Sequence, residues 1–201
     1  AKRKEKIIKK ILKMKLNFQY SRVYDELFNY MSRNYFDNSQ VIELETFTIQ
    51  LSNYWNKNHN KIVKEIEKVS GLKFSSNVEC FIVKHLGYRA ISEPFTVKMT
   101  KDFDYLTGVI IHELIHILLR DNQTILKLVN KKFEHEENDF KIHFPVLLIE
   151  RRVIENLFGE KFFSKIRKKD DHNPDLAFEW ANVNKVYDKF NNNIIKFLEK
   201  C

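Results

Sequence analysis

The sequence predicts an α+β fold that is mainly helical, with a small sheet placed just before a buried central helix. Three observations lead to this expectation. Apolar residues recur at helical spacing over most of the 201 residues, and the period changes to strict alternation within residues 77–100. The run 109–119 is apolar at every position except His112, Glu113 and His116. A helix that is apolar nearly all round is expected to lie at the centre of the protein.

The chain is expected to begin with a helical N-terminal region, residues 1–75, in which residues 20–35 and 41–69 form amphipathic runs. The pair Ser70 and Gly71 suits the end of the second run, because glycine readily takes the left-handed conformation that closes a helix. Residues 76–201 are expected to hold the functional site. The sequence contains no repeat and no low-complexity linker, so the two regions are expected to form one compact unit.

The small sheet is expected within residues 77–100. Val78, Cys80 and Ile82 alternate with other side chains, and the same spacing recurs at Phe95 and Val97. Asp102 or Asp104 would then cap the central helix. Further helices are expected at residues 124–137, 145–158 and 182–200, the second of them with Pro145 in its first turn.

Charge and composition limit the kinds of function that the chain can have. The formal charge is +8, and much of the excess lies in a basic amphipathic helix predicted between Lys2 and Lys15. Its simplest interpretation is a solvated helix face, and nucleic acid or an anionic surface is a weaker alternative. No apolar stretch approaches the roughly 20 residues that span a bilayer. Without a secretory signal, and with only Cys80 and Cys201, a cytoplasmic location is expected.

The motif His-Glu-x-x-His carries the chemistry. His112 and His116 lie one turn apart on one helix face, which lets both imidazoles share one Zn²⁺ ion. Glu113, about 100° round the helix, can reach a water activated by the metal and act as general base. Burial of three ionisable side chains is costly unless they are paired or bound to a metal. The competing interpretations are a chance match and a metal-free descendant of such a site.

This arrangement resembles the zincin class of metallopeptidases over roughly residues 78–158. The resemblance implies a zinc-dependent peptidase, with an endopeptidase favoured, and a substrate peptide paired along the strand from Pro94 to Thr100. The metzincin subclass is excluded because Leu119 and Asn122 stand where that pattern requires Gly and His. A gluzincin-like, small single-domain (minigluzincin-like) protein, whose third zinc ligand is a Glu from a later helix, is the closer resemblance.

Glu150 is the favoured third ligand because it falls on the apolar face of the helix predicted for residues 145–158. His143 is the rival third ligand, seven residues earlier on the same face. Glu136, which lies within a charged run, is a weaker candidate for the same role. Glu150 and His143 could also cooperate, one as ligand and one orienting the site.

Peptide hydrolysis also needs a second group that stabilises the negatively charged oxygen of the intermediate. His135, His172 and Tyr187 are candidates, and the sequence does not select one of them. The expected function is hydrolysis of peptide bonds through a metal-activated water with Glu113 as general base. Two alternatives remain. One is a latent or inactive zincin-like binding module, and the other is a nucleic-acid-associated metalloprotease that uses the basic N-terminal helix. The oligomeric state and the substrate stay open.

Overall fold

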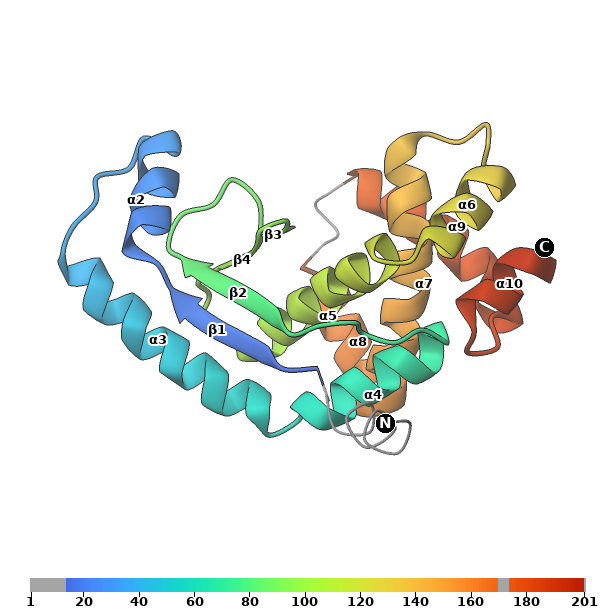
Figure 1. Ribbon diagram of the computed structural model, residues 1–201, viewed down its shortest axis with the longest axis horizontal. Helices are drawn as coiled ribbons and strands as arrows, with labels where there is room; N and C mark the ends of the chain where they lie inside the picture. The colour runs from blue at the N-terminus through green and yellow to red at the C-terminus, as the bar shows by residue number, and fades with distance from the viewer. Residues whose placement is uncertain (1–13, 170–173, 201) are drawn as a thin grey trace, which may run out of the picture.

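The computed structural model describes residues 14–169 and 174–200. This part of the chain is mostly helical and contains a small mixed sheet, which confirms the expected α+β class. The sheet and the helices α2 and α3 lie toward one end, the helices α6 to α10 lie toward the other, and α5 runs between them (Figure 1). The elements are β1 (Leu16–Tyr20), α2 (Arg22–Met31), α3 (Ser39–Asn56), α4 (His59–Ser70), β2 (Val78–Val83), β3 (Ala90–Ser92), β4 (Phe95–Lys98), α5 (Phe103–Arg120), α6 (Gln123–Lys132), α7 (Asn138–Phe158), α8 (Glu160–Arg167), α9 (Pro174–Val186), the 3₁₀ turn η1 (Tyr187–Lys189) and α10 (Ile194–Lys200).

The sheet has four strands in the order β1–β2–β4–β3. β1, β2 and β4 are parallel, and the short β3 runs antiparallel to β4 at the edge of the sheet. β3 is also the strand that packs most closely against α5. The central helix therefore lies beside a sheet edge whose backbone groups are open on one side within the described chain.

The helical expectation for residues 1–75 is wrong at Leu16–Tyr20, which form β1. Leu16 and Phe18 face the core and alternate with the more exposed Asn17 and Gln19, which is the period of a strand. Phe18 meets Trp55 of α3 edge to face at 6.1 Å. Because β1 pairs with β2 over its whole length, the sheet joins residues from both sides of the boundary expected near residue 75.

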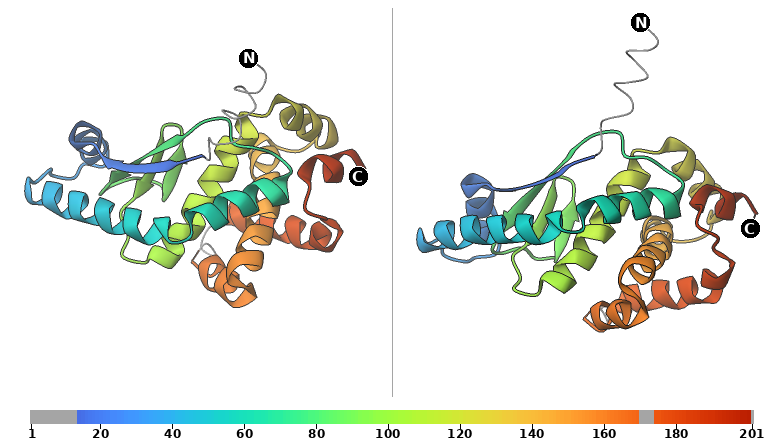
Figure 2. Two further views of the ribbon diagram at one scale, coloured as in Figure 1. Left: turned by 60° about the horizontal axis from the view of Figure 1, so that its bottom comes forward. Right: turned by 90° about the horizontal axis from the view of Figure 1, so that it is seen from below.

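α3 lies along one side of the sheet, and α4 follows it and packs against α7. α3 and α4 run nearly end to end, so they form a long flank visible in both views of Figure 2. Leu44, Leu51 and Ile62 are fully buried beneath this flank. Gly71 closes α4 with a φ of 76°, as expected from the sequence.

The central helix α5 begins at one of the two caps expected from the sequence. Asp102 caps it, and its carboxylate accepts a hydrogen bond of 3.0 Å from the backbone N–H of Tyr105. Asn122 accepts in the same way from Ile125 at the start of α6, so the chain turns immediately after Arg120. Between these caps nearly every side chain of α5 is buried, so its polar groups lie inside the protein.

α7 begins at Asn138, seven residues earlier than expected, so Pro145 lies inside the helix and not in its first turn. A proline in a helix interior removes one backbone hydrogen bond. Here the early turns are held by packing, because the rings of Phe133, Phe140 and Phe144 lie 5.0–5.4 Å apart. The additional turns carry His143 and place it on a rigid element.

Two other expected helices have different bounds in the structure. The helix expected at 124–137 is α6 and ends at Lys132, and the helix expected at 182–200 is α9 and α10 separated by the η1 turn. The basic helix predicted between Lys2 and Lys15 lies almost entirely outside the described residues. Within the described chain, no helix is both long enough and apolar enough to cross a membrane.

Candidate metal centre

The two motif histidines share one face of α5, as their spacing requires. Their ring centroids are 4.7 Å apart, and the Nε2 atom of His112 lies 3.0 Å from the Nε2 atom of His116. Two such nitrogens at this distance must share either one proton or one cation, because two lone pairs repel. Tetrahedral zinc with Zn–N bonds near 2.05 Å would set the nitrogens about 3.3 Å apart. The observed separation is close to that value.

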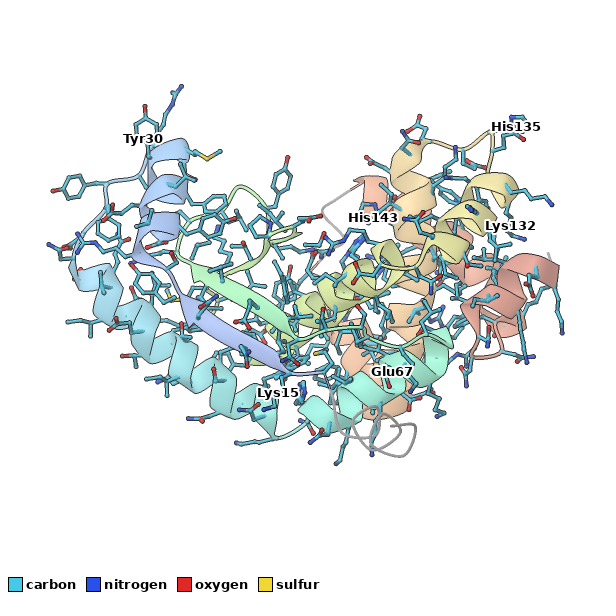
Figure 3. All side chains as sticks on the ribbon, in the orientation of Figure 1. Lys15, Tyr30, Glu67, Lys132, His135 and His143 are labelled. Atoms are coloured by element: carbon cyan, nitrogen blue, oxygen red, sulfur yellow. The ribbon has the colours of Figure 1, made fainter. Side chains whose placement is uncertain are left out.

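His143 completes a group of three histidines. Its ring centroid lies 5.2 Å from that of His116 and 5.9 Å from that of His112. Its side chain lies between α7 and α5 (Figure 3). Each of the three residues offers one nitrogen, and these nitrogens lie within 4.8 Å of one another. The described chain therefore contains a His112, His116 and His143 group that could hold a metal ion.

Glu150 lies on the opposite side of the His112 ring from this group. Its Oε2 atom is 2.7 Å from Nδ1 of His112, and both side chains are buried. A carboxylate there accepts the Nδ1 proton and leaves the Nε2 lone pair of His112 directed at the other histidines. Glu150 is thus placed to orient a ligand, while its rival His143 faces the group itself.

A second carboxylate lies beside His143. Nδ1 of His143 lies 3.3 Å from Oε1 of Glu179 on α9 and 3.1 Å from the backbone oxygen of Asp139. Both oxygens favour a proton on Nδ1, which leaves Nε2 of His143 as the free acceptor. Glu179 could not be found from the sequence, because it lies 36 residues from His143 on a helix that no motif connects to the site.

Burial sets the protonation states of the centre. It lowers the pKa of His112 well below its usual value and that of His116 to about 2, so both imidazoles are neutral, the form that binds metals. Burial of His143 also lowers its pKa, but hydrogen bonding to Glu179 and the charges of Glu179 and Asp139 outweigh this and raise it.

Glu113 is only 7% exposed. Burial raises the pKa of Glu113, as it does that of Glu150, to about 7. The positive charge of Arg89, just before β3, lowers the pKa of both carboxyls and so opposes that rise. No sequence motif pointed to Arg89. A divalent cation in the histidine group would favour the ionised form of Glu113 still further.

An apolar cavity adjoins the histidine group. It has a volume of about 290 Å³, and His116 and Ser92 of β3 lie in its lining. Its walls come mainly from α6 and α7, and the exposed side chains of Leu126 and Ile142 lie at its rim. A side chain bound in this cavity would lie next to the metal-capable group.

The other residues singled out in the sequence lie elsewhere or outside the described chain. Glu136 and His135 are exposed in the turn between α6 and α7, and Figure 3 shows His135 well away from His143. The Tyr187 hydroxyl donates to Glu155, and its ring lies between Arg151 and Arg152. His172 falls outside the described residues.

The expected substrate strand requires a correction. The segment from Pro94 to Thr100 contains β4, which pairs with β2 on one side and β3 on the other. A strand paired on both sides has no backbone groups left for a peptide. The open edge beside α5 belongs to β3, Ala90–Ser92, which the alternation pattern did not reveal because only three residues are extended.

Comparisons of this chain with protein-family models, curated proteins and solved structures give no match.

Proposed function

We propose that this protein is a zinc-dependent peptidase whose metal ligands are His112, His116 and His143 and whose general base is Glu113. The observation that carries the proposal is the three-histidine group built from α5 and α7. A buried His-Glu-x-x-His helix beside a small sheet resembles the zincin class, which supports a peptidase. The histidine group argues against the gluzincin-like ligand set expected from the sequence, in which Glu150 binds the metal.

The residues present fit a zinc ion. Imidazole nitrogens are favoured zinc ligands, and three protein ligands leave one position open, as catalytic zinc sites require. Two of the three imidazoles have their Nδ1 atoms held by an oxygen acceptor, which fixes the tautomer that binds through Nε2. A structural site would instead be closed by a fourth protein ligand, and no fourth member joins this group within residues 14–169 and 174–200.

In this function each residue has a distinct task. When bound, zinc supplies a Lewis acid that polarises a carbonyl group and lowers the pKa of water. Glu113 takes the proton of the attacking water and passes it to the leaving amine. Glu150 holds the ring of His112 in place. The edge of β3 pairs with the extended backbone of the substrate, because it is the open sheet edge beside α5.

The purified protein is expected to hold close to one zinc ion per chain, as measured by elemental analysis. His112→Ala and His116→Ala should each abolish this binding, because the two imidazoles occupy one helix face and no neighbouring residue replaces either of them. His59→Ala is the matched control, since His59 bonds to Trp55 and to the backbone of Met14 away from the centre. Protein that takes up no zinc even when zinc is added would overturn the proposed function.

The cavity beside His116 predicts the substrate preference. A peptide with an aliphatic or aromatic residue next to the cleaved bond should be preferred over one with a positively charged residue there by at least about 10-fold in kcat/KM, because the cavity is mainly apolar and the charged residues in its lining, Arg120 and Lys141, are both basic. Leu126→Glu puts a negative charge at the rim and should reduce that preference without changing zinc content.

Leu27→Glu provides the comparison for this variant, since Leu27 is an exposed leucine on α2, outside the cavity. Equal cleavage of apolar and positively charged peptides by the unmodified protein would show that the cavity does not select substrates.

A further inference from the structure

Glu179 of α9 is a buried carboxylate in contact with the candidate metal centre. It is 4% exposed, and its Oε1 atom lies 3.3 Å from Nδ1 of His143. Its second oxygen, Oε2, is buried and has no hydrogen-bond partner within the described chain. A carboxylate in this position is stabilised only by a nearby cation or a hydrogen-bond donor. The imidazole of His143 is the donor that the structure provides.

The contact repeats one already described on the other side of the centre. Glu150 of α7 accepts a hydrogen bond from Nδ1 of His112, and Oε1 of Glu179 of α9 lies within ion-pair distance, 3.3 Å, of Nδ1 of His143. Histidines that bind metals commonly donate their other ring N–H to a carboxylate, which fixes the ring and raises its basicity. His116, the third member, has no such carboxylate among the described residues.

We infer that Glu179 is a positioning residue that holds His143 in the orientation and tautomer required to bind the metal. The inference rests on the proposed metal centre and assigns a role in it to α9, which packs against α7 but contributes no ligand. The backbone oxygen of Asp139 accepts the hydrogen bond from Nδ1 of His143 at 3.1 Å, so it would still hold the ring in part if Glu179 were removed. Loss of Glu179 should therefore weaken metal binding without abolishing it.

The test is titration of the metal-free full-length protein with Co²⁺, followed by its visible absorption, and competition of Co²⁺ with Zn²⁺. Glu179→Leu removes the acceptor with little change in volume and should weaken binding about 10- to 100-fold. Glu179→Gln keeps an acceptor oxygen but loses the charge, and its affinity should fall between those of Glu179→Leu and the unmodified protein. The Co²⁺ absorption bands should shift in Glu179→Leu, which a purely structural role of Glu179 would not cause.

Trp180→Phe is the matched control for the packing of α9. Trp180 is 2% exposed, its ring lies 5.3 Å from that of Phe163, and its indole N–H is buried without a partner in the described chain. This variant should lower Tm and leave the Co²⁺ affinity and spectrum unchanged.

Unchanged Co²⁺ affinity and spectrum in a folded Glu179→Leu variant would overturn the inference while leaving the proposed function intact. If that variant fails to fold, Glu179→Gln with full affinity and an unchanged spectrum would overturn it equally. Failure of the unmodified protein to bind any metal would overturn both proposals.

Discussion

Glu113→Gln is expected to retain zinc and to lose at least about 10²-fold in peptidase activity, the usual scale for the removal of a general base. Zinc should remain because Glu113 is not a member of the three-histidine group. Activity should fall because glutamine cannot accept the proton of the attacking water. Elemental analysis and a fluorogenic peptide assay on the same preparation measure the two effects separately.

Two further variants test whether the loss of activity is specific to the carboxylate of Glu113. Glu155→Gln removes another partly buried carboxylate, one that is bonded to Arg151 and Tyr187 on the outer side of α7, and should leave activity unchanged. Glu113→Asp retains a carboxylate but shortens its reach, so it should fall between the unmodified protein and Glu113→Gln. Hydrolysis at this site is the wrong mechanism if Glu113→Gln cleaves peptides at the original rate.

The elements that the sequence predicted well are those whose signals are local. The cap at Asp102, the stop at Gly71 and the alternation of β2 each depend on residues within a few positions, and all three are present in the structure. β1 was missed because its alternation covers only five residues between stretches of helical spacing. β3 was missed because three residues are too few to show a period. Pairing with distant strands stabilises both, and a local pattern does not record that pairing.

For the candidate site, the motif on α5 was recognisable because both histidines lie within one helical turn. For the third ligand the sequence favoured Glu150, with His143 as rival and Glu136 as a weaker candidate, and in the structure both Glu150 and His143 contact α5. Sequence spacing could not separate them, since residues seven apart share a face whichever of them binds. The choice depends on how far α7 is displaced along α5, which is set by tertiary packing. Glu179 could not be predicted either, because its contact with His143 depends on how α9 packs against α7.

His143→Ala is expected to reduce zinc affinity by more than the roughly 100-fold that marks the upper end for residues that only orient a ligand. Glu150→Ala should reduce it by about 10- to 100-fold, because Glu150 contacts Nδ1 of His112 and not the histidine group. Competition with a chromophoric chelator gives both affinities. Thermal unfolding should show the same order, since zinc that binds only the folded state adds its binding free energy to stability.

This pair of variants separates the two ligand sets that the sequence left open. In a three-histidine site, His143→Gln should also lose zinc, because its amide is a poor substitute for imidazole, while Glu150→Gln should stay near the unmodified protein, since its amide oxygen still accepts from His112. In a site with Glu150 as ligand, the order reverses: Glu150→Ala would lose zinc and His143→Ala would keep it. That reversed order would restore the gluzincin-like ligand set and reject the one favoured by the 2.7 Å contact between Glu150 and His112.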